Sequence, residues 1–431
     1  MDRSTIPRGL WFILYDIIHN LGILLAHIVS PFNGKLRKTL KGRRKGVDGW
    51  TIGSADARDC VLLHVASYGE FEGIRPLIDR LNNTGKYRVA ISFSSPSAAK
   101  TVSAKSELWA YGYLPNDYIY QQLKLFGRLD PRLILISKHD FWPNLLRAAK
   151  SLDIPVILIN ANFHSGSHRT LPVVRSFHRT FMKHLHAVWT VSETDAKRVE
   201  PLLSIGTELL SVGDTRYDRV RQRAIKGKER FNNLRKALQP GPVMIAGSTW
   251  QQGEKICWAA FLSIVKELPE AKLVVVPHEP TSEALNRNQA IASANQLKVC
   301  LFSKWDGKKI GEQVLLVDRM GVLADLYTVG WAAYVGGGFG KGIHSVIEPA
   351  AHGLPVMFGP NHHVSHEASL LLEAGGGFVV KTAKDIEKLW HKWLVDSNSY
   401  KQASDAAANV VMSREGTAER IIELLEPYLY R

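Results

Sequence analysis

The chain has 431 residues, 45% of them hydrophobic, and this allows two or three domains with substantial cores. Its three cysteines are widely spaced and form no CxxC motif, which argues against a disulfide framework or zinc site and favours a reducing compartment. The net charge of +15 suits anionic partners such as phosphorylated substrates or lipids. Because no RNP, zinc-finger or helix-turn-helix motif is present, we predict no nucleic-acid partner.

Residues 9–32 are almost continuously apolar and long enough to span a bilayer. The polar residues that interrupt this run fall near one helical face, which favours a helix lying in the membrane interface or tilted into it; they are Asp16, His19, Asn20 and His27. Residues 1–46 hold nine lysines and arginines against two aspartates, and we expect them to contact anionic cytoplasmic headgroups. The alternative is a buried helix followed by a solvated run of charges.

From residue 60 onwards, strands and helices alternate, which is typical of parallel sheets built from βαβ units. A charged segment at 224–241, ending in a Pro-Gly-Pro break, separates two such halves. We therefore expect an α/β chain with two doubly wound, Rossmann-like domains and a membrane-associated N-terminal helix. The expected parts are an anchor (1–46), a first domain (47–225) and a second domain (226–431) whose final helix could pack back on the first.

The first predicted strand ends in His64-Val65-Ala66-Ser67-Tyr68-Gly69-Glu70. Gly69 lets the backbone turn, and Glu70 then lies at the start of the following helix, where its carboxylate could accept a proton from a hydroxyl. The alternative is that an acidic residue simply stabilises the helix N-terminus. The helix dipole also lowers the pKa of a carboxylate there, so a useful base would need desolvation by a bound substrate.

The stretch 335–360 has the pattern strand, glycine-rich loop, helix, strand. Ser345 and Glu348 have the spacing of a capping box, and backbone N–H groups at a helix start attract anions. Lys341 and His344 add side-chain donors. We interpret the stretch as a nucleotide-phosphate site, with a tight loop and an ordinary helix cap as the alternative.

Three more loops in the second half follow predicted strands, at residues 247–250, 276–280 and 318–323. The carboxyl ends of parallel strands share one sheet edge, so these loops and the glycine-rich loop are expected to converge there. The chain has no GxSxG elbow, no Walker A motif, no GxGxxG after the first strand and no Asp-x-Asp pair. We therefore expect neither a dinucleotide enzyme nor a dedicated divalent-metal site.

These motifs together resemble the 3-deoxy-D-manno-octulosonic acid (Kdo) transferases of lipid A assembly, which have the two-domain GT-B glycosyltransferase fold. The resemblance runs from about residue 62 to 376. It rests on His64-x-x-Ser67-x-Gly69-Glu70, on Trp142-Pro143-Asn144, on the strand end 246–249 and on the glycine region with Glu348-Pro349-Ala350-Ala351. It implies inverting, cofactor-free and metal-independent transfer from CMP-Kdo.

The resemblance also implies roles for individual residues. Glu70 would be the general base, with Lys138 and Arg216 as further catalytic positions, and Ser67 and Gly69 would contact the acceptor. The donor would be bound by residues on the strand-end loops of the second half: Ser248, Thr249, Pro277, His278, Met320, Gly321, Val322, Gly337, Gly338, Lys341, His344, Ser345, Val346, Ile347 and Glu348.

Several positions depart from the family pattern. Lys138 replaces a glutamate, Arg216 replaces a lysine, and His278 stands where the family has a donor-site arginine. Val322 replaces a glutamate and Ser345 an asparagine. The change at Lys138 puts a transition-state role of that position in doubt, and the change at His278 could signal another donor.

On this basis we expect Kdo transfer from CMP-Kdo to a lipid A precursor, lipid IVA, at the cytoplasmic face of the inner membrane. The expected partners are CMP-Kdo, the lipid precursor and anionic lipids. Two alternatives remain: a GT-B enzyme that uses another nucleotide sugar, such as a UDP-sugar, on a lipid acceptor, and a membrane-docked binding protein without turnover.

Overall fold

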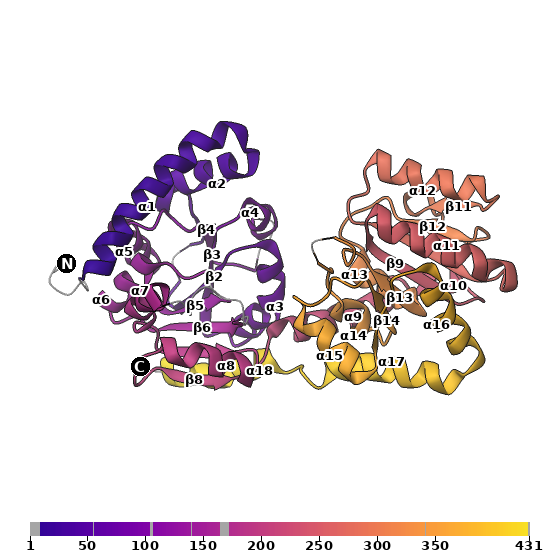
Figure 1. Cartoon of the computed structure of the whole chain (residues 1–431). Helices are drawn as coiled ribbons and strands as arrows, with labels where there is room; N and C mark the ends of the chain where they lie inside the picture. The colour runs from indigo at the N-terminus through magenta and orange to yellow at the C-terminus, as the bar shows by residue number, and fades with distance from the viewer. Residues whose placement is uncertain are drawn as a thin grey trace. The chain divides into compact units, whose positions relative to one another are not determined.

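The structure is a computed structural model that describes residues 9–54, 56–103, 107–138, 140–163, 172–340 and 342–429. The chain divides into two compact units, the first formed by Met1–Arg219 with Gly416–Arg431 and the second by Val220–Glu415 (Figure 1). The sequence suggested a boundary after residue 225 and a separate part for residues 1–46. The units divide between Arg219 and Val220, inside the helix α9 (Thr215–Arg230) that also contains residue 225, and the first unit includes the N-terminal helices.

The first unit contains an eight-stranded sheet in the order β1-β4-β3-β2-β5-β6-β7-β8. All neighbours are parallel except β1 and β4. Its central strands are apolar runs buried on both faces, as parallel sheets require. The strands are β1 (Thr51–Ile52), β2 (Asp59–Val65), β3 (Tyr87–Phe93), β4 (Ala110–Tyr113), β5 (Pro131–Ser137), β6 (Val156–Ala161), β7 (Ala187–Thr190) and β8 (Glu208–Ser211).

Helices cover both faces of this sheet, and each face has its own apolar cluster. The final helix α18 (Thr417–Leu429) returns to the first unit, where Ile421, Leu425 and Leu429 join one cluster. The other helices are α1 (Leu10–Val29), α2 (Gly34–Arg44), α3 (Tyr68–Asn83), α4 (Pro96–Val102), α5 (Ile119–Leu129), α6 (Pro143–Ser151), α7 (Pro172–Met182) and α8 (Glu193–Val199), with short 3-10 turns η2 (Ser30–Phe32), η3 (Gly46–Gly49) and η5 (Glu200–Leu202).

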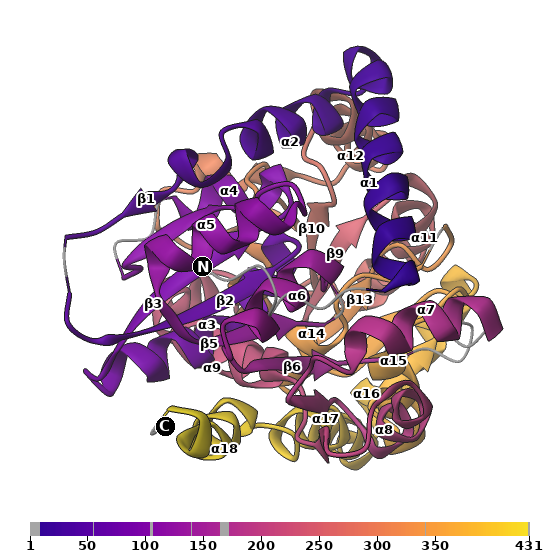
Figure 2. The same ribbon diagram turned by 90° about the vertical axis from the view of Figure 1, so that its left-hand side faces the viewer.

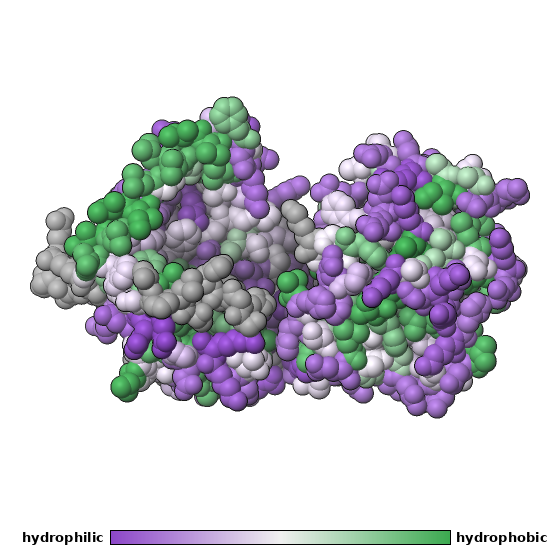
Figure 3. All heavy atoms as spheres, in the orientation of Figure 1, coloured by the Kyte–Doolittle hydropathy of each residue, from purple (hydrophilic) through white to green (hydrophobic). Residues whose placement is uncertain are grey.

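Helix α1 has two different faces. Phe12 is buried in the first unit, and Asp16 accepts hydrogen bonds from Asn144 (2.8 Å) and Arg147 (3.4 Å) of α6. The opposite face is apolar and open to the surroundings, with Ile17, Leu21 and Leu25 each more than half exposed. This face forms a continuous hydrophobic surface along the helix (Figure 3). Among the described residues, Leu10–Phe32 is the one segment long and apolar enough to cross a membrane.

The second unit repeats the architecture with seven parallel strands in the order β11-β12-β10-β9-β13-β14-β15. Helices again cover both faces and close two apolar clusters. The strands are β9 (Val243–Thr249), β10 (Lys272–Pro277), β11 (Val299–Leu301), β12 (Val314–Leu316), β13 (Ala332–Val335), β14 (Val356–Phe358) and β15 (Gly377–Val379).

The helices of the second unit connect these strands, and the last two follow each other directly in the chain. They are α10 (Asn232–Ala237), α11 (Gln251–Glu267), α12 (Ser282–Ala294), α13 (Leu323–Leu326), α14 (Ile347–Ala351), α15 (His366–Ala374), α16 (Ala383–Val395) and α17 (Ser397–Met412), with 3-10 turns η6 (Phe302–Lys304) and η7 (Tyr327–Val329). Each unit is thus a doubly wound α/β sheet, and the predicted fold class is confirmed.

Candidate functional site

Glu70 lies at the first turn of α3, directly after the carboxyl end of β2. Ser67 caps the helix by accepting a hydrogen bond from the Glu70 N–H (3.4 Å). The Glu70 side chain turns back to the strand end, where its Oε2 accepts from the Ala66 N–H at 2.6 Å. Glu70 therefore bonds to the backbone at the start of the helix and is also placed for a role in the site, because the Ala66 N–H holds its carboxylate in a fixed position.

The electrostatic surroundings of Glu70 favour a base. Burial raises its pKa above the ordinary value of 4.5, and the negative charge of Asp140 acts in the same direction. The Ala66 hydrogen bond, Lys138 and His64 oppose this shift without cancelling it. From the sequence we expected the helix dipole to weaken the base until a substrate desolvated it. In the structure the protein itself already supplies the desolvation.

A buried polar network supports this carboxylate, and sequence reasoning missed three of its members, Ser92, Ser94 and Asp140. His64 lies fully buried in β2, with Nδ1 2.9 Å from the Ser92 hydroxyl and Nε2 3.0 Å from Asp140 Oδ2. The Ser94 hydroxyl donates to the same Asp140 oxygen at 2.6 Å. Burial works against ionisation of Asp140, but these bonds outweigh it and hold the pKa of Asp140 below its ordinary value. In the sequence, the one signal for a role of Ser92 and Ser94 is their position at the end of a strand.

Helix α2 brings a further cation to this edge of the sheet. The Arg43 guanidinium lies over the Trp142 ring, 4.7 Å from its centroid, and its charge helps keep Asp140 ionised. Among the described residues, Arg43 Nε and Trp142 Nε1 are buried without a hydrogen-bond partner. From the sequence, Arg43 belonged to a membrane-facing basic run. The structure instead turns it towards the polar network.

The other two predicted catalytic positions also lie in the first unit. Lys138 follows β5 with a left-handed backbone (φ 62°), and its charge lowers the pKa of Glu70. Arg216 pairs with Asp214 at 2.7 Å. Its Cγ would lie 2.8 Å from a Cβ at Gly73, so the absence of a side chain at Gly73 lets the arginine pack against α3 one turn after Glu70.

In the second unit, three rings from different strand-end loops stack on one another. His278, after β10, lies between Trp250 (ring centroids 4.7 Å apart) and His344 (4.4 Å). The Trp250 Nε1–H donates to His344 Nε2 at 3.2 Å. Burial and the adjacent His278 lower the pKa of His344, so its neutral form accepts this hydrogen bond. The predicted convergence of loops thus produces an aromatic wall.

The glycine-rich loop closes a pocket of about 590 Å³ beside this wall. Its lining comes from the loop and from the start of α11: Trp250, Gln251, Gln252, Gly253, Gly337, Phe339, Gly340, Gly342 and His344. Gly337 has a left-handed backbone (φ 94°), and a Cβ on Gly338 would lie 2.6 Å from the Gly359 backbone nitrogen. The loop therefore needs glycine at both positions to pass so close to the end of β14.

The predicted capping box at Ser345 is wrong. Helix α14 begins at Ile347, its N-cap is Val346, and no side chain caps it. Gly342, with φ 144°, begins a non-helical segment that continues through Ser345, so the helix starts later than the Ser-Glu spacing suggests. Glu348 remains in the first turn of α14, where its charge adds to the effect of burial in raising the pKa of Tyr327. Lys341 lies outside the described residues.

The remaining predicted donor residues lie near the same sheet edge but outside this pocket lining. Ser248 has a left-handed backbone (φ 50°), and the buried Thr249 hydroxyl donates to Glu254 at 3.1 Å. Pro277 ends β10, while Met320, Gly321 and Val322 form the loop before α13, in which Met320 is exposed and Val322 buried. The described residues contain no group of three His, Cys, Asp or Glu side chains placed to bind a metal.

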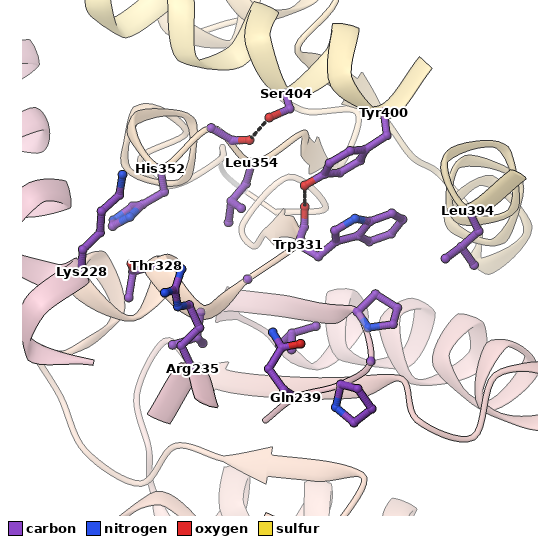
Figure 4. A pocket seen from close by; sticks show the side chains of 17 residues that line it. Lys228, Arg235, Gln239, Thr328, Trp331, His352, Leu354, Leu394, Tyr400 and Ser404 are labelled. Carbon is purple, nitrogen blue, oxygen red and sulfur yellow. Dashed lines mark hydrogen bonds between the residues drawn. The ribbon is translucent and has the colours of Figure 1, made fainter. Parts of the chain in front are cut away.

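A second large pocket, of about 630 Å³, lies at the opposite edge of the same sheet, next to the start of β9. Lys228, Arg235 and His352 line it (Figure 4). Its walls are fixed by hydrogen bonds from Tyr400 to the Trp331 carbonyl (3.0 Å) and from Ser404 to the Gly353 carbonyl (2.6 Å). Ligands of doubly wound sheets bind at the carboxyl ends of the strands, so this larger pocket is not the candidate donor site.

Two doubly wound units with chemistry-bearing loops at their carboxyl edges form the GT-B architecture. Residues 39–219 match the family model for 3-deoxy-D-manno-octulosonic-acid transferase. The chain is 25% identical over 379 residues to the 3-deoxy-D-manno-octulosonic acid transferase of Haemophilus influenzae, covering 86% of this chain and 87% of that protein. The Aquifex aeolicus enzyme of the same name is 28% identical over 335 residues, covering 77% of this chain and 85% of that enzyme.

These matches confirm the resemblance that the motifs predicted, and they indicate an enzyme of the glycosyltransferase class. Among solved structures, a UDP-GlcNAc 2-epimerase from Neisseria meningitidis matches with a TM-score of 0.64 and 15% identity, over 85% of this chain and 99% of that one. This likeness concerns the fold alone.

Proposed function

We propose that the chain transfers Kdo from CMP-Kdo to the lipid A precursor lipid IVA, with inversion and without a metal. The observation that carries this proposal is Glu70, a carboxylate fixed by the Ala66 N–H and with a pKa raised by burial. The names of the related enzymes support the choice of Kdo as the transferred sugar. The pocket beside the glycine-rich loop would bind the cytidine monophosphate part of the donor.

In this mechanism Glu70 takes the proton from the acceptor hydroxyl while its oxygen attacks the anomeric carbon of Kdo. The bond from that carbon to the CMP phosphate breaks, and the electron pair leaves with the phosphate. Backbone N–H groups of the glycine-rich loop and hydrogen-bond donors near His344 would stabilise the leaving phosphate. One well-placed donor of this kind contributes about 3 kcal/mol of electrostatic stabilisation. Ser67 and Gly69 would border the acceptor hydroxyl, and Lys138 and Arg216 would offset negative charge nearby.

We place the enzyme at the cytoplasmic face of the inner membrane, held by the apolar face of α1. The polar face of this helix bonds to the first unit through Asp16 and Asn20, and a transmembrane orientation would break those bonds. An interfacial position leaves them intact and buries the apolar residues. The exposed basic residues of α2, such as Lys35 and Arg37, would contact anionic headgroups.

The test is a Kdo-transfer assay with CMP-Kdo and lipid IVA on Glu70→Gln. We expect loss of transfer with CMP-Kdo binding retained, because Gln can still accept the Ala66 hydrogen bond but cannot take a proton. Glu72→Gln is the matched control, since Glu72 lies on the same helix and pairs with Arg219 at 2.6 Å. Full turnover by Glu70→Gln would remove the carboxylate from the base role.

A second candidate is transfer from a UDP-sugar. It is favoured by His278, which stands in the ring stack where the family resemblance leads us to expect an arginine facing the donor phosphate. Thermal-shift measurements separate the two candidates. CMP should raise the melting temperature more than UDP at equal concentration, and the reverse order would favour the UDP-sugar enzyme.

A further inference from the structure

A pocket of about 440 Å³ in the first unit lies between α2, α4 and the end of β4. Figure 1 shows α2 and α4 close to each other in this unit. We call it the lysine pocket. Its lining combines four lysines with three aromatic rings: Lys38, Lys41, Lys45, Lys100, Phe93, Tyr111 and Tyr113, with Gly42, Gly49, Ala99 and Ser103.

The charge of this pocket is not neutralised by the protein. Lys38, Lys41 and Lys45 follow the spacing of one helical face of α2 and its C-cap, and Lys100 approaches from α4. Within the described parts of the chain, none of the four forms an ion pair with a carboxylate. Asp48, in the turn after α2, instead forms ion pairs with Lys124 (3.0 Å) and Arg128 (3.4 Å).

The aromatic side of the pocket is rigidly built. The rings of Phe93 and Tyr113 meet edge to face with centroids 4.7 Å apart. Tyr113 lies so close to α2 that a Cβ on Gly42 would be 2.4 Å from its ring. Gly42 is therefore required for the helix to reach this depth, and the contact fixes the lysines of α2 around the ring.

The pocket shares a sheet edge with Glu70. Phe93 and Tyr113 are the last residues of β3 and β4, and Ser94, next to Phe93, donates to Asp140 of the network beside Glu70. β2, which leads to Glu70, is the neighbour of β3 on its other side. Two strand spacings separate β2 from β4, a distance of about 10 Å. A ligand at Glu70 that is the size of a disaccharide headgroup would therefore reach the lysines.

We propose that the lysine pocket binds a phosphate group of the lipid acceptor while the acceptor hydroxyl faces Glu70. This inference rests on the proposed function. It adds a determinant of acceptor specificity, because Glu70 alone does not distinguish a phosphorylated acceptor from an unphosphorylated one. The pocket lysines are exposed, as Lys35 and Arg37 of α2 are, so both sets would attract bulk anionic lipid, but Lys35 and Arg37 do not line the pocket.

The experiment compares two full-length double variants with equal charge change. Lys41→Gln/Lys100→Gln removes two pocket cations, and Lys35→Gln/Arg37→Gln removes two exposed cations of α2. Kdo transfer is measured in neutral detergent with the phosphorylated lipid precursor and with the same lipid after phosphatase treatment. We expect the pocket variant to raise KM for the phosphorylated acceptor about tenfold, since charged hydrogen bonds of this kind contribute about that much. Its kcat should change little, and the control variant should retain the wild-type preference.

Two further arms identify the source of the phosphate and separate this inference from the proposed function. Binding of glucosamine 1-phosphate, measured by calorimetry without donor, should be weakened by the pocket variant even if no transfer is detected. Sedimentation with vesicles containing 20% anionic phospholipid should be weakened equally by both variants. Equal effects of both variants on acceptor KM, or selective loss of vesicle binding by the pocket variant, would overturn the proposal. Matching melting temperatures of the variants establish that both are folded.

Discussion

At the scale of single residues, the pKa of Glu70 is raised by burial and adjusted by nearby charges whose removal has opposite effects. Lys138→Gln removes a positive charge that lowers this pKa, so the acidic limb of the pH profile of kcat/KM should move to higher pH. Asp140→Asn removes a negative charge that raises it, so the limb should move to lower pH. Lys138→Arg keeps the charge and should leave the limb in place. Shifts of both variants in the same direction would exclude Glu70 as the titrating base.

The same pKa shift predicts a cost to stability. A carboxyl whose folded-state pKa lies above 4.5 favours the folded state at low pH and loses that contribution as pH rises from 4.5 through the raised value. Glu70→Gln has no charge to desolvate. The variant should therefore match the wild type in melting temperature near pH 4 and equal or exceed it at pH 7.5. A lower melting temperature at pH 7.5 would mean that the carboxylate stabilises the fold.

At the scale of elements, α1 should separate stability from membrane binding. Phe12 is buried in a core cluster and lies 4.5 Å from the Arg147 guanidinium, so Phe12→Ala should destabilise the protein by about 3–5 kcal/mol in denaturant unfolding. Ile17 is 53% exposed, and Ile17→Ala should leave the unfolding free energy almost unchanged while weakening vesicle sedimentation. If both variants changed only membrane binding, α1 would not be docked on the first unit.

The glycine-rich loop offers a substitution that can be matched with a control. Gly338→Ala would force a methyl group to within 2.6 Å of the Gly359 backbone, so the loop must move and CMP affinity should fall about tenfold, as for the loss of one or two hydrogen bonds. The control lies outside the loop and the pocket: Gly311→Ala has no neighbour within 4 Å and should bind CMP normally. Thermal shift with CMP measures both, and equal shifts would remove the glycine-rich loop from the donor site.

The sequence predicts the elements that depend on neighbouring residues, and it misses those that depend on contacts between residues far apart in the chain. Apolar runs such as 132–137 and 272–276 indicate strands in the sequence, because burial on both faces leaves a local signature. Strand β4 was missed because Ala110–Tyr113 is short and only half buried. The lysine pocket could not be anticipated, since it depends on Tyr113 packing against Gly42, 71 positions earlier. At α14 the local spacing of Ser345 and Glu348 predicts a capping box, but the path of the glycine-rich loop makes the helix begin later, at Ile347.

At the scale of the whole molecule, the last helix ties the C-terminus to the first unit. Asp218, in α9, accepts the Gly416 N–H at 2.5 Å and the Ala418 N–H at 2.9 Å, which satisfies the otherwise free donors at the start of α18. α18 in turn contributes Ile421, Leu425 and Leu429 to the cluster that packs against β2 and α3. The stability of the first unit therefore depends on a segment separated from the rest of it in sequence by the entire second unit.

This dependence predicts that Asp218→Ala loosens the first unit without disturbing the second. Removing the carboxylate leaves two N–H groups at the helix start without their acceptor, a loss of about 1–3 kcal/mol. Hydrogen exchange should accelerate in α18 and α3 but not in β9 or β13, and CMP should still shift the melting of the second unit. Glu419→Ala is the control, because Glu419 is 59% exposed in its ion pair with Arg80 and exposed pairs contribute little. Faster exchange throughout both units would mean that they unfold as one, and α18 would then stabilise the whole chain.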